Sequence, residues 1–286
     1  MITLRDAVLQ HLYTIGPCTT SQLGTILGTD RSHLGRLLSR LTDQGLVTGH
    51  PWRGRSVWSL SRSALEALTI QQGYPASAAR WLQLSGYSTA TRAHDLGVID
   101  VLASLVRSSH PPEHGVLDWH GPGLSALPYA RWVSPPGKEP RIHGVTLSPD
   151  ATLEYLWQGE SQPLYLRGLV EYDTGSERLP ALEAKADRYA RAGHPEWFVL
   201  LLVTTGGPQR LGTLLHTFRA LLPESVIIAG APTSHAFTDP QGPVWIRDGR
   251  GQSLRDLAAP VRVPEGLAVW GTAIPTRPRD TAGRFA

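Results

Sequence analysis

Residues 19–60 read TTSQLGTILGTDRSHLGRLLSRLTDQGLVTGHPWRGRSVWSL, and this stretch holds the clearest structural signals in the chain. Thr19 and Gln22 have the spacing of a capping box, so a short helix begins there and ends at Gly28. Either of the two residues that follow can cap another helix at once. The apolar residues of that helix recur at i, i+3, i+4 and i+7, which predicts one buried face: Leu34, Leu37, Leu38 and Leu41.

The opposite face of the same helix is basic, and no acidic residue lies between Arg31 and Arg40. Small hydroxyl side chains let a helix backbone approach a DNA groove, and arginines reach phosphates or guanine edges. The residues that we expect to contact DNA from this helix are Arg31, Ser32, Arg36, Ser39 and Arg40.

A hairpin signal follows this helix. Val47 opens a first short strand, and residues 56–60 form a second one. The turn between them reads Trp-Arg-Gly-Arg and contains no acid. Arginines at such a tip lie beside the DNA backbone or in the minor groove, so we add Arg53 and Arg55 to the predicted contacts.

An earlier helix precedes these elements, because Leu4, Val8 and Leu12 recur at helical spacing. Three helices, a hairpin and a further helix from Ser63 are the order found in bacterial winged-helix regulators. We therefore predict a winged helix-turn-helix domain over residues 1–73 that binds double-stranded DNA. The alternative interpretation is that the arginines of the third helix form only a solvated face.

The composition limits the classes of protein to which the chain can belong. The chain has 286 residues and a formal net charge of +3, which by itself is too weak a bias to establish a nucleic-acid partner. The single cysteine, Cys18, excludes an internal disulfide and a zinc site built from cysteines. The sequence contains no signal-peptide pattern and no apolar run long enough to cross a bilayer, so we expect a cytoplasmic protein without a membrane partner.

The rest of the chain divides into three predicted parts. Residues 74–140 form a connector, with a helix over residues 94–106 and a long Pro- and His-rich loop over residues 108–140. Residues 141–268 alternate between strand and helix patterns, and residues 269–286 are expected to be a flexible tail.

The alternating part contains six predicted elements. The strands are expected at residues 145–147, 165–172, 197–204 and 226–229, and the helices at residues 179–192 and 211–222. The unbroken apolar run from Trp197 is typical of a central strand that is covered on both faces. Right-handed crossovers between parallel strands are expected.

Three carboxylates stand at predicted strand ends. Asp150 follows the first strand of this part, and Glu171 and Asp173 end the second. If the two strands are neighbours, the acids meet, and their oxygens suit Mg²⁺ or Mn²⁺. Mg²⁺ bound by Asp150 and Glu171 is therefore the one cofactor that the sequence suggests.

The same acids are similar in pattern to nucleases of the restriction-endonuclease type, whose signature is Pro-Asp and then a strand with acid-x-Lys. Pro149, Asp150 and Glu171 match, but Asp173 stands at the lysine position. Lys185, on the next helix, can supply an ammonium from a displaced position. The catalytic candidates are thus Asp150, Glu171, Asp173 and Lys185.

We predict a nuclease-like, mixed-sheet α/β domain that is catalytically degenerate, within an overall α+β or α/β fold. An active metal-dependent nuclease and an unrelated α/β fold are the alternatives. Nothing fixes a metal geometry for four residues of the predicted loop, namely His110, His114, Asp118 and His120. The sequence also offers no Gly-rich phosphate loop, which argues against an ATP-driven replication protein.

Several short motifs in this order resemble the bacterial replication-relaxation family of plasmids and mobile elements. They follow the N-terminal segment and are His94–Asp100, Trp119, Ser148–Ala151, Leu169–Glu177, Lys185–Tyr189 and the apolar strand Phe198–Val203. The resemblance covers roughly residues 5–225 and implies a role in plasmid replication and DNA relaxation. After Trp119 members of the family often carry an acid, whereas this chain has His120.

The function that we expect is therefore double-stranded DNA binding in the replication or DNA relaxation of a plasmid, phage or mobile element, or in its control, without catalysis. One alternative is a metal-dependent DNA endonuclease or nickase. Another is a winged-helix transcriptional repressor with a dimerisation or sensor domain. Other replication or mobilisation proteins, and a second copy of the chain, are the expected protein partners.

Overall fold

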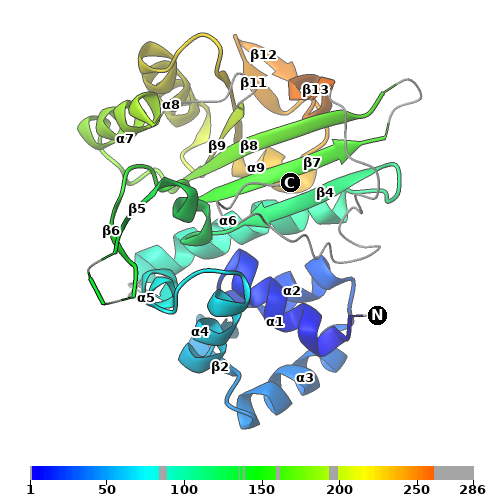
Figure 1. The fold of residues 1–286 in the computed structure, drawn as a ribbon. Coiled ribbons are helices and arrows are strands. Elements are labelled where there is room, and N and C mark those ends of the chain that lie inside the picture. Colours follow the sequence, from blue (N-terminus) through cyan, green and yellow to red (C-terminus); the bar gives the residue numbers. More distant parts are fainter. Residues whose placement is uncertain are drawn as a thin grey trace.

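The computed structural model describes residues 2–83, 89–134, 136–137, 139–158, 162–192 and 199–260 (Figure 1). Helices combine with a three-stranded sheet, an eight-stranded mixed sheet and a two-stranded sheet. This arrangement confirms the α+β class that the sequence predicts. The predicted tail, residues 269–286, lies outside the described residues.

The N-terminal segment contains the helices and the hairpin that its sequence predicts. Its elements are α1 (Leu4–Ile15), β1 (Cys18–Thr19), α2 (Thr20–Leu27), α3 (Arg31–Asp43), β2 (Val47–Trp52), β3 (Arg55–Leu60) and α4 (Arg62–Gln71). The capping box at the start of α2 is present, since Thr19 and Gln22 exchange hydrogen bonds. All four predicted leucines of α3 are buried, so its apolar face packs as its spacing requires.

The middle of the chain differs from its prediction. Its elements are α5 (Ser77–Gln83), α6 (Thr89–Arg107), β4 (His114–His120), a 3₁₀ turn (Leu124–Tyr129), β5 (Ala130–Val133) and β6 (Arg141–Val145). The long loop predicted over residues 108–140 is thus wrong in part, because β4 is an edge strand of the large sheet. The strand predicted at residues 145–147 is also wrong, since β6 ends at Val145 and pairs with β5 in a separate sheet.

The elements after residue 150 are β7 (Ala151–Trp157), β8 (Leu164–Asp173), α7 (Leu179–Arg191), β9 (Val199–Thr204), α8 (Gly207–Leu221), β10 (Ile227–Pro232), α9 (Thr233–Thr238), β11 (Trp245–Arg247), β12 (Arg250–Gln252), a 3₁₀ turn (Arg255–Leu257) and β13 (Ala259–Pro260). From β8 to β10 the order of strands and helices agrees with the prediction, whereas β7 and the elements after β10 were not predicted. The sheet order is β12-β11-β10-β9-β8-β7-β4, and β13 pairs with β8. Strands β8, β9 and β10 are parallel, and β4, β7 and β8 are antiparallel.

Helices cover both faces of this sheet. Strand β9 shows the arrangement, because Val199, Leu201 and Val203 join the apolar cluster that contains α6, whereas Leu200 and Leu202 join the cluster of α7 and α8. All six residues of β9 are buried, which confirms the central strand that its apolar run predicts. Trp197 and Phe198 lie outside the described residues.

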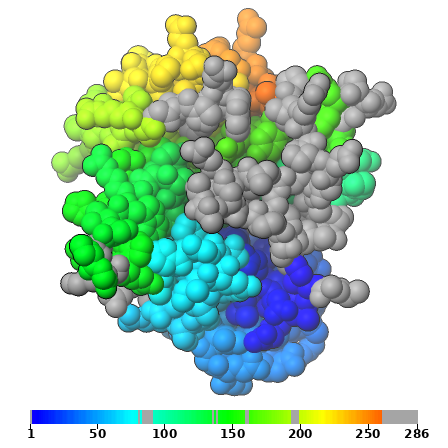
Figure 2. Space-filling model, in the orientation of Figure 1, coloured from blue at the N-terminus to red at the C-terminus, as the bar shows by residue number. Residues whose placement is uncertain are grey.

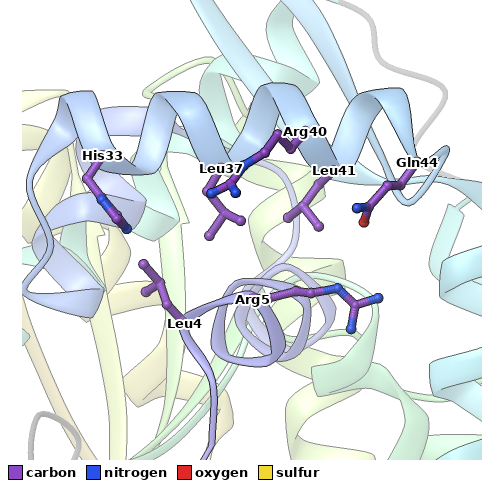
Figure 3. A pocket seen from close by; sticks show the side chains of 7 residues that line it. All are labelled: Leu4, Arg5, His33, Leu37, Arg40, Leu41 and Gln44. Atoms are coloured by element: carbon purple, nitrogen blue, oxygen red, sulfur yellow. The ribbon is translucent and has the colours of Figure 1, made fainter.

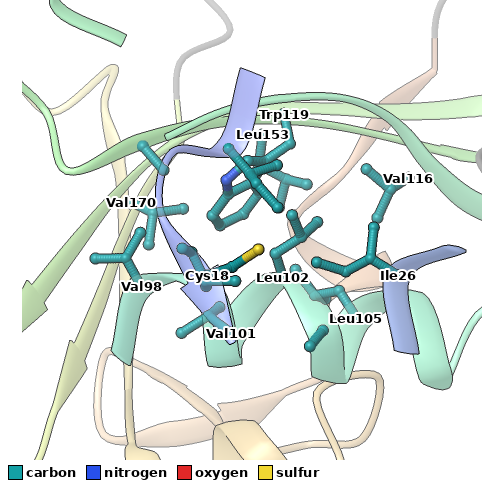
Figure 4. Packing of buried hydrophobic residues seen from close by; sticks show 14 of the residues in the cluster. Cys18, Ile26, Val98, Val101, Leu102, Leu105, Val116, Trp119, Leu153 and Val170 are labelled. Atoms are coloured by element: carbon teal, nitrogen blue, oxygen red, sulfur yellow. The ribbon is translucent and has the colours of Figure 1, made fainter. Parts of the chain in front are cut away.

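The N-terminal helices share an apolar core with the sheet. Cys18 and Ile26 pack with Val98 and Leu102 of α6 and with Trp119 of β4 (Figure 4). In the space-filling view the N-terminal segment lies at the lower end of the molecule and β11–β12 at the upper end (Figure 2). None of the helices in the described part of the chain has the length and apolar character that a bilayer crossing requires.

Candidate functional site

Asp150 and Glu171 come together at one end of the large sheet. Asp150 immediately precedes β7 instead of ending a strand, which corrects the sequence prediction. Because β7 and β8 are antiparallel and Ala151 pairs with Val170, the start of β7 lies beside the end of β8. The backbone N–H of Tyr172 donates to Oδ2 of Asp150 over 2.8 Å and fixes this carboxylate at the sheet edge.

Lys185 lies between these two acids. Its Nζ is 3.9 Å from Oδ2 of Asp150 and forms an ion pair with Oε2 of Glu171. One helical turn later on α7, the hydroxyl of Tyr189 donates to Oε1 of Glu171. We call Asp150, Glu171 and Lys185 the acid–lysine site, and all three side chains are mostly shielded from solvent.

His94 of α6 closes the other side of the site. It donates from Nε2 to Oδ2 of Asp150 over 3.1 Å and from Nδ1 to Oδ1 of Asp95 over 3.2 Å. Gly97 allows α6 to approach β8 closely, because a side chain at this position would overlap the ring of Tyr172. This close approach brings His94 to Asp150. A ring that donates from both nitrogens is an imidazolium, so His94 adds a second, partly buried cation.

The pKa values of these groups follow from burial and charge. Burial lowers the pKa of His94, but its bonds to Asp150 and Asp95 outweigh this effect and raise the pKa to about 10. Burial would raise the pKa of Asp150, yet the Lys185 ammonium and His94 hold it well below its usual range. Burial and the charge of Asp150 raise the pKa of Glu171, while Lys185 and Tyr189 oppose that shift.

Asp173 does not join the acid–lysine site. Arg210 of α8 binds it with two hydrogen bonds, 2.9 Å to Oδ2 and 2.7 Å to Oδ1, and the hydroxyl of Thr204 donates to Oδ2 over 2.7 Å. A carboxylate engaged by a bidentate arginine has its charge and its lone pairs already matched. The lysine position of the nuclease-type signature therefore carries a separate ion pair.

The donor chemistry of the acid–lysine site suits Mg²⁺ only in competition with Lys185. Mg²⁺ accepts one or two carboxylates and completes its shell with water or phosphate, so Asp150 and Glu171 are adequate ligands in kind. In the described part of the chain, however, no group of three or more His, Cys, Asp or Glu side chains is arranged to hold a metal ion. An incoming cation would have to displace the Lys185 ammonium from Glu171.

A second candidate site lies on α3 and the β2–β3 hairpin. All seven residues predicted to contact DNA are exposed: Arg31, Ser32, Arg36, Ser39, Arg40, Arg53 and Arg55. We call them the α3–hairpin surface. Among the described residues, the five arginines of this surface have no carboxylate within ion-pairing distance.

Local geometry presents these side chains outward. Asp30 caps α3 by accepting from the N–H groups of Ser32 and His33 over 2.9 and 3.0 Å. Trp52 pairs with Arg55 across a two-residue turn, in which Arg53 has φ 45° and Gly54 has φ 74°. Positive φ at both central residues is the tight hairpin turn that matches the twist of two strands.

A groove of about 290 Å³ borders this surface between α1 and α3. Its polar lining comes from Arg5 of α1, from His33 and Arg40 of α3 and from Gln44, the residue that follows α3 (Figure 3). Leu4 of α1 and Leu37 and Leu41 of α3 also line the groove, so it combines an apolar floor with two arginines, one from each helix.

Sequence reasoning assigned no role to His94, Tyr189 or Arg210. His94 stands in a motif of the resemblance but was not connected with Asp150. Tyr189 follows Lys185 by four residues, so both must share one face of α7. Arg210 has no local signal, because only the order of β8 and β9 in the sheet brings α8 to Asp173.

The comparison with known families gives one match. The sequence model of a family described as Replication-relaxation matches residues 9–196, which is more than half of the chain and includes the α3–hairpin surface and the acid–lysine site. No curated protein and no solved structure gives a significant match.

Proposed function

The chain belongs to the replication-relaxation family, and we propose that it binds double-stranded DNA through the α3–hairpin surface. Membership of the family suggests a role in the replication or DNA relaxation of mobile elements. We place this DNA binding in the replication or relaxation of a plasmid, phage or other mobile element, or in its control.

The observation that carries the proposal is the exposure of five arginines on one helix and one hairpin tip, none of which forms an ion pair in the described part of the chain. Phosphate contacts supply most of the affinity of DNA-binding proteins, and arginine also reads guanine in the major groove. Guanidinium groups that form no ion pair within the protein can bind a polyanion without first breaking an internal ion pair.

In this proposal, residues 1–73 constitute a winged helix-turn-helix domain. Helix α3 is the recognition helix, which enters the major groove with Arg36 and Arg40 one turn apart. The β2–β3 hairpin is the wing, with Arg53 and Arg55 at the backbone or in the minor groove. The helices α1 and α2 and the strand β1 pack against these two elements.

Footprinting on the DNA of the host element tests the proposal. The wild type is expected to protect a discrete region, and Arg36→Ala/Arg40→Ala is expected to lose this protection. Arg62→Ala serves as a matched control, since Arg62 is exposed on α4 outside the α3–hairpin surface. Absence of protection with the wild type, or equal protection with the double variant, contradicts the proposed interface.

A second candidate function is metal-dependent DNA cleavage at the acid–lysine site. One observation favours it. The nuclease-type signature has a lysine at the position that Asp173 occupies here, and Lys185 of α7 brings an ammonium group to both acids instead. Asp150 and Glu171 would hold Mg²⁺, which would supply an activated water and a polarised phosphate. The first proposal treats the same part of the chain as a nuclease-like scaffold without cleavage.

Nicking of supercoiled DNA, with Mg²⁺ and with a chelator, separates the two functions. The scaffold predicts protection without cuts under both conditions. The nuclease predicts cuts with Mg²⁺ only, and these cuts are lost in Asp150→Asn and in Lys185→Ala. Far-UV circular dichroism of both variants shows whether a lost activity reflects lost folding.

A further inference from the structure

Two of the histidines that the sequence analysis expected in a loop form a cross-strand pair. His110 and His114 lie opposite each other in an isolated antiparallel bridge, in which each backbone N–H donates to the carbonyl of the other residue, over 3.0 and 3.2 Å. Directly opposite residues of such a bridge carry their side chains on the same side. The two ring centroids are 5.2 Å apart. We call these two residues the histidine pair.

The hydrogen bond of the His110 ring fixes the position of its proton. Nδ1 lies 3.0 Å from the backbone carbonyl oxygen of Ser108. A carbonyl oxygen only accepts, so Nδ1 of His110 carries the hydrogen and donates it. Nε2 of the neutral ring therefore holds a lone pair, and no described residue forms a hydrogen bond with this nitrogen.

The hydrogen bonds around Tyr155 assign the same form to His114. The hydroxyl of Ser109 donates its one hydrogen to the carbonyl of Leu105 over 2.8 Å, so it accepts from the Tyr155 hydroxyl, 3.1 Å away. The side-chain amide of Gln241 donates to the Tyr155 oxygen over 2.8 Å. Nδ1 of His114 also lies 2.8 Å from this oxygen, whose own hydrogen is already used. Nδ1 therefore donates, and Nε2 of His114 keeps its lone pair.

The surroundings favour the neutral form of the His114 ring. Burial and then the charge of His110 lower the pKa of His114, and Arg255 acts in the same direction, while Glu113 opposes the shift. Neutral imidazole is the form that binds a metal ion, and a ligating histidine usually donates from its other ring nitrogen to a fixed acceptor. Both members of the histidine pair meet this second condition, through Ser108 and Tyr155.

The separation of the two rings suits one shared ion. An imidazole nitrogen binds Zn²⁺ at about 2.0–2.1 Å, so two imidazoles on one tetrahedral ion have ring centroids about 5 Å apart. We propose that the Nε2 atoms of His110 and His114 bind one divalent metal ion of the class that prefers imidazole nitrogen, with Zn²⁺ as the probe. The described residues offer no third His, Cys, Asp or Glu ligand, so water completes the coordination shell.

The proposed ion would connect two parts of the fold. His110 follows the end of α6 by three residues, and His114 is the first residue of β4. Their opposition exists only in the folded chain, so bound Zn²⁺ stabilises the native state and raises Tm. This site is independent of the proposed DNA binding, because it uses neither the α3–hairpin surface nor the acid–lysine site.

Nitrogen NMR spectra of protein with isotope-labelled histidine rings, recorded at slightly alkaline pH during a titration with ZnCl₂, test the site. Without metal, both rings of the histidine pair are expected to carry their proton on Nδ1. One equivalent of Zn²⁺ is expected to shift Nε2 of His110 and His114, and the same concentration of MgCl₂ should shift neither. A proton on Nε2 of either ring, or no Zn²⁺ shift at the pair, overturns the proposal.

Variants distinguish this site from the other histidines of the chain. His110→Ala should keep the fold, because this side chain is exposed, and is expected to lose both the Zn²⁺ binding seen by calorimetry and the rise in Tm. His114→Ala should lose them too, with circular dichroism as a check of folding. His143→Ala, at an exposed position of β6, is the matched control and should bind Zn²⁺ as the wild type does. Wild-type affinity in His110→Ala, or equal weakening in His110→Ala and His143→Ala, overturns the proposal.

Discussion

The α3–hairpin surface and the acid–lysine site treat charge in opposite ways. On the surface, five arginines are exposed and have no carboxylate partner within the described residues. In the site, Lys185 and His94 neutralise Asp150 and Glu171 inside the molecule. The charges of the surface can therefore bind a ligand. The charges of the site form ion pairs that connect α6, α7 and the adjacent ends of β7 and β8.

This contrast predicts where a substitution affects folding and where it affects binding. Removing one member of a buried ion pair leaves an uncompensated charge and costs about 3–5 kcal/mol, whereas exposed pairs contribute about 0–1 kcal/mol. Variants of the site should therefore change stability first. Variants of the surface should change DNA affinity at nearly constant stability.

The largest expected effect is that of Lys185→Met, which keeps the apolar stem and removes the cation. Asp150 and Glu171 then face each other with less compensation, and we expect a loss of about 3–5 kcal/mol in the free energy of unfolding by urea. Arg191→Ala, in an exposed i,i+4 pair with Asp187 on the same helix, is expected to lose only about 0.3–0.5 kcal/mol.

The double variant Lys185→Met/Glu171→Gln sharpens this test. It removes both charges of the closest pair, so part of the lost stability should return and the two substitutions should not be additive. Additive losses, or equal losses for Lys185→Met and Arg191→Ala, would show that the lysine does not compensate the acids.

The next effect is a pH dependence due to His94. Its pKa is raised from 6.5 to about 10 in the folded protein. A group with a raised pKa binds its proton more tightly when folded, so its contribution is fully present below pH 6.5 and is lost as pH rises through about 10. Urea unfolding of the wild type should therefore give decreasing stability over this range.

His94→Gln is expected to flatten that decrease, because a glutamine donates to Asp150 without titrating. The raised pKa of Glu171 acts in the same direction, so a part of the slope should remain. His216→Gln, at an exposed position of α8, should keep the wild-type slope. Identical pH profiles for the wild type and His94→Gln would contradict the assignment of an imidazolium at His94.

Local patterns predicted the fold better than the site. The leucines of α3, the capping box and the apolar run of β9 each depend on residues close in sequence, and all three agree with the structure. Strand β4 was missed because its histidines and the prolines around it suggest a loop, although it pairs with β7 in the large sheet. Pairing partners of that kind are not encoded in a local window.

The geometry of the acid–lysine site likewise depends on strand pairing that a local window of sequence does not encode. The residues of this site could be named from their types and order, but Asp150 was expected to follow a strand at residues 145–147, whereas it precedes β7, which was not predicted. Asp150 meets Glu171 because β7 and β8 are antiparallel. The separation of Asp173 depends on α8, which follows a strand placed on the other side of β8. Sequence spacing fixed the helix face of Lys185 and Tyr189, and topology fixed the rest.

On the α3–hairpin surface, Arg36→Ala and Arg40→Ala are each expected to weaken DNA binding by about 1–3 kcal/mol where the side chain reads a guanine. Where it contacts only phosphate, binding should weaken evenly across sequences and the salt slope should fall by about one. Titrations of a target duplex and an unrelated duplex distinguish these cases. Unchanged affinity in both single variants and in the double variant removes α3 from the interface.

The smallest expected effect is that of Arg53→Ala/Arg55→Ala at the hairpin tip. Both side chains are exposed, and the φ of 45° at position 53 is as costly for arginine as for alanine, so stability should change by less than about 0.5 kcal/mol. Two lost phosphate contacts should lower the salt slope of DNA binding by about two. Arg131→Ala/Arg141→Ala is a matched control, since it removes two exposed arginines from the other hairpin, β5–β6. Equal slopes for these two double variants would mean that the β2–β3 tip contributes only its net charge, whereas a lower slope for Arg53→Ala/Arg55→Ala alone identifies it as a contact.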